Sequence, residues 1–148
     1  MDGISIMSTF RAVSVIFAVA SVATGVQAII NPAGFATSFG IPLVPHPSPE
    51  HAKALKPRAT PTAQEAAISS AYIALLGARQ LGTGITLLVF AYQGKWVESA
   101  TILAIIGIVV AGMDGYHIAR SGPLASGLFH AIPGALIAAL AAATLHAG

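Results

Sequence analysis

The 148-residue sequence contains no cysteine and little charge, and both absences narrow the classes of protein to which it can belong. Without cysteine there is no disulfide, no thiolate nucleophile and no cysteine-ligated metal. Charged residues make up 8% of the chain and hydrophobic residues 55%, which is too little polar surface to coat a soluble globule. The seven Lys and Arg are spread thinly, so no basic cluster is present to bind nucleic acid. The composition therefore predicts an integral membrane protein surrounded by membrane lipids.

Four apolar stretches are each long enough to cross a bilayer, which takes about 20 helical residues. We expect transmembrane helices at about 9–30, 66–92, 97–119 and 124–146. The first stretch could pass for a signal peptide, but its length and the sparse charge before it favour a spanning helix. The sequence thus predicts one all-α domain, a four-transmembrane-helix bundle. Such a multi-pass protein would lie in the endoplasmic reticulum if the source is eukaryotic.

One long loop, residues 31–65, separates the first two helices. It holds seven of the nine prolines and shows no sustained hydrophobic periodicity. Connections this long are usually lids or binding segments. We expect its apolar first part to lie at the membrane interface and to cap the bundle.

The second helix carries a polar stripe, which is unusual for a helix in lipid. Seven residues in alternating steps of four and three share one side of it: Glu65, Ser69, Tyr72, Leu76, Arg79, Thr83 and Thr86. A charge at mid-bilayer costs about 2.5–3.5 kcal/mol, so we expect the stripe to face the bundle interior or a hydrated cavity. On the same helix, small residues favour close helix packing and would permit a homodimer: Ala74, Ala78, Gly82 and Gly84.

The other three helices also carry polar groups, close to the side of the membrane on which the long loop lies. Asp114 and His117 are three residues apart on the third helix, and His130 lies about two turns inside the fourth. We predict a pocket there, with the catalytic residues Asp114, Arg79, His117 and His130 and the substrate-binding residues Tyr72, Gln27, Asn31, Glu65 and Thr83. Alternatively, Arg79 and Asp114 form a structural ion pair with the polar groups as hydrogen-bonding glue.

A metal site is a weaker interpretation of the same residues. Asp114, His117 and His130 would satisfy the usual count of protein ligands for a catalytic zinc. The Asp114–His117 spacing suits proton transfer equally well, so we assign neither metal nor cofactor.

Short motifs distributed over most of the chain resemble the DoxX-like small integral membrane proteins, in particular a largely fungal branch of them. The motifs are NPAGF at 31–35, FGIP at 39–42, GARQLGTG at 77–84 and DG at 114–115. The resemblance implies a four-helix membrane bundle with Arg79 and Asp114 at family positions. Small membrane proteins of this kind are similar to some in fungal natural-product pathways, where cofactor-free hydrolases, isomerases and cyclases act on lipophilic intermediates.

Together these patterns predict a cofactor-independent membrane enzyme whose substrate is a lipophilic small molecule. Asp114 would act as general acid or base, with Arg79 keeping it ionised or stabilising oxyanion charge and His117 or His130 relaying a proton. Epoxide opening, by water or by an internal hydroxyl, fits this set, and isomerisation fits almost as well. The competing hypothesis is a non-catalytic membrane subunit or ligand carrier.

Overall fold

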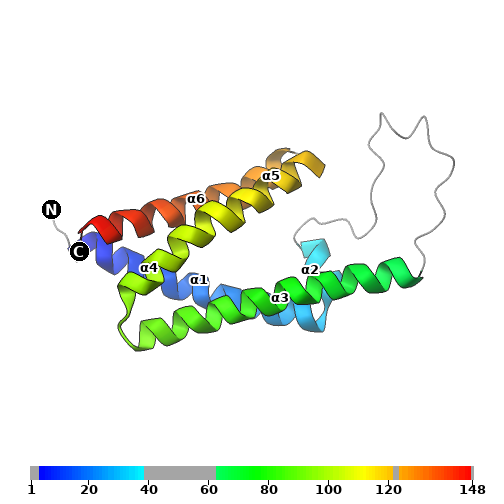
Figure 1. The fold of residues 1–148 in the computed structure, drawn as a ribbon, viewed down its shortest axis with the longest axis horizontal. Coiled ribbons are helices and arrows are strands. Elements are labelled where there is room, and N and C mark those ends of the chain that lie inside the picture. Colours follow the sequence, from blue (N-terminus) through cyan, green and yellow to red (C-terminus); the bar gives the residue numbers. More distant parts are fainter. Residues whose placement is uncertain (1–3, 39–62, 122–123, 148) are drawn as a thin grey trace. The chain divides into compact units, whose positions relative to one another are not determined.

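The computed structural model describes residues 4–38, 63–121 and 124–147, and this part of the chain is helical with no strand. Three of its helices are α1 (Ile4–Ile30), α2 (Pro32–Ser38) and α3 (Ala63–Tyr92), as Figure 1 shows. The chain continues as α4 (Trp96–Ile105), the π-helical turn η1 (Ile106–Val110), α5 (Ala111–Ser121) and α6 (Leu124–Ala147). Because α4, η1 and α5 follow one another without a break, they form one long helix.

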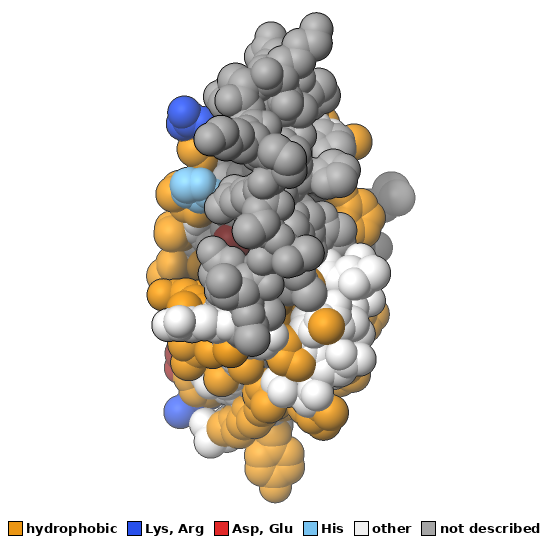
Figure 2. Space-filling model, turned by 90° about the vertical axis from the view of Figure 1, so that its right-hand side faces the viewer, with side chains coloured by type: hydrophobic (Ala, Val, Ile, Leu, Met, Phe, Trp, Pro, Cys, Tyr) orange, Lys and Arg blue, Asp and Glu red, His pale blue; other side chains and the backbone are white. Residues whose placement is uncertain are grey.

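Within the described residues, four helices are long and apolar enough to cross a membrane. They cover Ile6–Ile30, Ala67–Tyr92, Trp96–Arg120 and Gly127–Ala147. In Figure 2 hydrophobic side chains form much of the visible surface that is not grey, with few charged groups among them. The prediction of an all-α, multi-pass membrane protein with four spanning helices is confirmed.

The connection after α1 differs from the expected loop, because it starts with the helix α2. Asn31 is the residue before this helix, and its Oδ1 accepts a hydrogen bond of 2.9 Å from the Gly34 backbone N–H. Pro32 follows at the first helical position, where the missing N–H has no cost. The Asn-Pro pair is typical of the start of a helix as well as of the end of the preceding one, so the sequence itself contains the signal for this cap. The end of the expected loop also differs, because residues 63–65 already belong to α3. Residues 39–62, with His46 and His51, lie outside the described part of the chain.

The chain divides into two compact units, and each is described by itself. Unit 1 comprises residues 1–20 and 84–148, and unit 2 comprises residues 21–83. The buried core of unit 1 consists of Phe10, Ala18, Leu87, Ala100, Leu103 and Ala141. The start of α1, the end of α3, α4 and the end of α6 therefore share one core. The smaller core of unit 2 consists of Ala28, Ala36 and Ile73, with Phe35 packed against them.

In unit 1, small residues let α6 pack closely on the long helix. A Cβ atom added to Gly115 would lie 2.6 Å from the Cβ of Ala131, and one added to Gly127 would lie 2.5 Å from the Cβ of Ala119. A Cβ atom added to Gly107 would likewise clash with the backbone oxygen of Gly134. Larger side chains would force the helices apart, so this contact requires glycine or alanine at these positions.

The π-helical turn η1 keeps these small residues on one side of the long helix. Ala119 lies nineteen residues after Ala100. In a regular α-helix, at about 100° per residue, Ala119 would point about 100° away from the direction of Ala100 after five full turns. A π-turn closes i→i+5 hydrogen bonds and takes up one residue more than an α-turn, which offsets that difference in direction. Ala100, Gly107 and Gly115 are consequently all buried. Without the π-turn, Asp114 would take the direction of Gly115 and point at α6.

In unit 2, a second close approach joins α1 to α3. A Cβ on Gly77 would lie 2.6 Å from the Cβ of Ala28, and one on Gly25 would lie 2.6 Å from the backbone nitrogen of Leu81. A Cβ on Gly82, by contrast, would meet no described atom within 4 Å. Ala78 and Gly82, two members of the expected packing strip, are exposed and therefore do not make this close approach. Spacing alone favours both strips, and only the partner helix selects between them.

Candidate functional site

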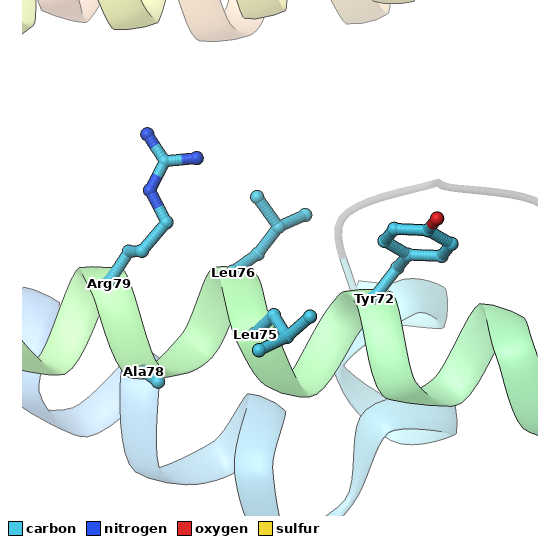
Figure 3. Close-up of a pocket in the computed structure, with 5 residues that line it drawn as sticks. All are labelled: Tyr72, Leu75, Leu76, Ala78 and Arg79. Carbon is cyan, nitrogen blue, oxygen red and sulfur yellow. The ribbon is translucent and has the colours of Figure 1, made fainter.

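A pocket of about 630 Å³ lies along one side of α3 in unit 2. It is lined by Tyr72, Leu75, Leu76, Ala78 and Arg79. Figure 3 shows Tyr72, Leu76 and Arg79 extending from the same side of the helix, in the order that steps of four and three predict. The lining is apolar apart from the Tyr72 hydroxyl and the Arg79 guanidinium. This pocket can therefore accept a lipophilic molecule that offers an oxygen to one or both of them.

The packed side of α3 lies next to this pocket. Ile73 and Gly77 are buried against α1, and the Gln80 side chain donates a hydrogen bond of 3.3 Å to Ser21 Oγ. Tyr72 and Leu76 keep 66% and 51% of their surface exposed. Within unit 2, then, the polar stripe does not supply the packing face, and the side chains that line the pocket stay accessible.

The other predicted substrate-binding residues have different surroundings. Asn31 uses its side chain to cap α2. Gln27 is exposed on α1 and Thr83 is half-buried on α3. Glu65 belongs to α3, but its side chain lies outside the described part of the chain. Their role in substrate binding remains a prediction.

A second group of ionisable side chains lies on α5 in unit 1. Asp114 and His117 are both exposed, and the ring of Tyr116 meets that of His117 edge-on at 5.3 Å between centroids. Arg120 donates a hydrogen bond of 2.9 Å from Nη1 to the Tyr116 hydroxyl, which lies one turn before it. Four polar side chains thus lie within about two turns of α5. This surface can exchange protons with a molecule that reaches it.

Sequence reasoning missed two members of the α5 group and one contact in unit 2. Tyr116 and Arg120 are four residues apart, which is the spacing of neighbours on a helix surface and could have been read from the chain. Ser21 and Gln80 are far apart in sequence, so no local pattern joins them. Only the packing of α1 on α3 makes that hydrogen bond.

Arg79 and Asp114 belong to different units, so each is described in its own surroundings and their pairing remains a prediction. Among the described residues, no three His, Asp or Glu side chains come together as metal ligands. The side chain of His130, the third predicted ligand, lies outside the described part.

A second pocket of about 460 Å³, lined by apolar side chains and glycine, lies in unit 1 where the π-turn meets α6. Its lining residues are Gly107, Ile108, Gly112, Ala131, Ala135, Ala138, Ala139 and Ala142. It offers a ligand shape and hydrophobicity but no hydrogen-bonding side chain.

Comparison with known proteins gives one family and no characterised relative. No curated protein and no solved structure matches the chain. Residues 18–144 match the family described as "Domain of unknown function (DUF4267)", a stretch that begins in the second half of α1 and includes nearly all of α6. That match covers both ionisable groups described above. The chain belongs to the DUF4267 family.

Proposed function

We propose that this protein is a cofactor-independent membrane enzyme that performs acid–base chemistry on a lipophilic small molecule. The observation that carries the proposal is the group of titratable and hydrogen-bonding side chains on α5, within a helix that is apolar enough to cross a membrane. Ionisable residues in membrane spans are expensive and are usually functional. The apolar pocket on α3 supports the lipophilic nature of the ligand.

Epoxide opening is the reaction that suits these groups best. The Asp114 carboxylate takes a proton from water while the water oxygen attacks an epoxide carbon, and the carbon–oxygen bond of the ring breaks. His117 in its protonated form gives a proton to the leaving oxygen, which yields a diol. Transfer of the proton from Asp114 to His117 or through His130 restores both groups. With an internal hydroxyl in place of water, the same steps yield a cyclic ether.

A fungal natural-product pathway is the setting that the DoxX-like resemblance suggests, and we extend the proposal to it. We also propose the endoplasmic reticulum as the membrane and a homodimer as an assembly that the exposed small residues of α3 permit.

The test uses purified protein in nanodiscs with 1,2-epoxydodecane as the probe and measures the diol by gas chromatography. Wild-type protein should form diol, and Asp114→Asn should lower the rate at least about 100-fold, the lower end of general acid–base effects. Glu98→Gln is the matched control, because Glu98 is an exposed carboxylate on the same long helix, in α4. An unchanged rate in Asp114→Asn, or no diol above the protein-free reaction, would reject epoxide opening.

The second candidate is a non-catalytic membrane subunit or ligand carrier. The Ser21–Gln80 hydrogen bond favours it, because it shows polar side chains serving as glue between helices of this chain. Loss of folding in both Asp114→Asn and Arg79→Gln would support this candidate, with the two charges as a structural pair.

A further inference from the structure

We infer that the α3 pocket binds the ionised carboxylate of a lipophilic acid through Arg79. The inference rests on the proposed function in one respect, since it names the class of substrate that the enzyme would take. Binding itself is independent of turnover, so the two can fail separately.

Arg79 lies deep within the second span. It lies twelve residues after Ala67 and thirteen before Tyr92, the ends of the second span. At about 1.5 Å per residue, each end is about 18–20 Å away along the helix. The hydrocarbon core is about 30 Å thick, so Arg79 lies near its middle. A guanidinium at that depth requires a counter-charge or water.

The described part of unit 2 places no carboxylate close to Arg79. The described stretches of this unit, 21–38 and 63–83, contain one carboxylate, that of Glu65. Glu65 lies fourteen residues before Arg79, or about 21 Å along α3, beyond the reach of either side chain. No described residue of unit 2 can therefore neutralise the guanidinium.

The pocket places apolar surface directly beside that charge. Leu75 and Leu76 line it between Tyr72 and Arg79, and Figure 3 shows Tyr72 and Arg79 on the same side with Leu76 between them. The two polar residues are seven positions apart, about 10 Å along the helix. A chain lying over Leu76 would thus offer its anionic end to Arg79 and a second oxygen to Tyr72.

The charge of the ligand follows from that of the site. One guanidinium neutralises one carboxylate and can hold it by two parallel hydrogen bonds. A phosphate monoester carries about −1.5 to −2 at neutral pH, which would leave uncompensated charge in the hydrocarbon. A phospholipid phosphodiester carries one charge, but it sits at the bilayer surface, about 15 Å from the midplane. A lipophilic carboxylate is therefore the ligand that fits both charge and depth.

The experiment measures equilibrium binding of radiolabelled palmitate, with methyl palmitate as the neutral analogue, to protein in phosphatidylcholine nanodiscs. Palmitate should bind at least about tenfold more tightly than its ester, since hydrogen bonds to charged groups contribute enough for that factor. Arg79→Gln should abolish the preference and Arg79→Lys should retain part of it. Arg11→Gln is the matched control, because this arginine belongs to unit 1 and does not line the pocket. Its Cζ lies 5.2 Å from the centroid of the Trp96 ring.

Several outcomes would overturn the inference. Equal binding of acid and ester by wild-type protein would do so without any variant. Displacement of palmitate by phosphatidylglycerol at equal concentration would assign Arg79 to lipid headgroups. If Arg79→Gln unfolds and Asp114→Asn restores its thermal stability, the arginine is neutralised within the protein.

The same assay separates this inference from the proposed function. Asp114→Asn should keep the palmitate preference while it loses diol formation. Diol formation from a neutral epoxide in a protein that does not prefer palmitate over its ester would leave the enzyme standing and remove the carboxylate site.

Discussion

At the scale of single residues, the polar side chains of this membrane protein divide by what they contact. Asn31 caps a helix, and Ser21 and Gln80 join two helices, so their polarity is used inside the fold. Arg79 lines a pocket and Asp114 is exposed on α5. The spacing of residues predicted which positions of α3 share a side. The spacing could not predict which polar side chains form hydrogen bonds within the fold, because those bonds depend on the partner helix.

The Ser21–Gln80 contact gives a prediction at this scale. Gln80→Leu should destabilise the protein by about 0.6 kcal/mol and at most about 1.7, the range for interhelical hydrogen bonds in membranes. Thermal unfolding in detergent, followed by circular dichroism, measures the difference. Gln27→Leu is the control, because Gln27 is exposed on α1 and its replacement should leave the midpoint unchanged. A larger shift for Gln27→Leu than for Gln80→Leu would refute this assignment.

At the scale of elements, the long helix from Trp96 to Ser121 is organised by its π-turn. The sequence predicted a spanning helix over 97–119 but gave no sign of the extra residue, because an apolar run such as Ile106–Val110 fits an α-turn and a π-turn equally. Only the small residues on both sides of it, which must meet α6 together, require the change in register. The turn thereby also keeps Asp114 away from α6.

The π-turn predicts an asymmetry between deletion and insertion. Deletion of Ile108, which is 68% exposed, should convert the turn to an α-turn and keep Gly115 against α6. Insertion of one alanine after Ile108 should rotate α5 by about 100° and bring larger side chains onto α6. We expect the deletion variant to remain folded and the insertion variant to lose its cooperative unfolding transition in detergent. Equal stability of the two variants would contradict this role of the turn.

At the scale of the whole molecule, composition and hydropathy were sufficient to predict the class of protein. Four apolar stretches of spanning length leave few alternatives to a multi-pass helical membrane protein, and the part of the chain that the structure describes has four such helices. The helix α2 was missed, because seven residues are too few for a periodic signal and the prolines favoured a loop. The site was predicted only in part, since the sequence indicates that charges in a membrane need partners without naming them.

The central claim is that the charges within the spans of this protein serve a lipophilic ligand. Native mass spectrometry of wild-type, Arg79→Gln and Arg11→Gln proteins, purified from the same membranes, tests it most directly. The wild-type and Arg11→Gln proteins should retain a bound lipophilic acid, identified by fragmentation, that Arg79→Gln lacks. The same bound molecules on all three proteins, or none on any of them, would contradict the claim.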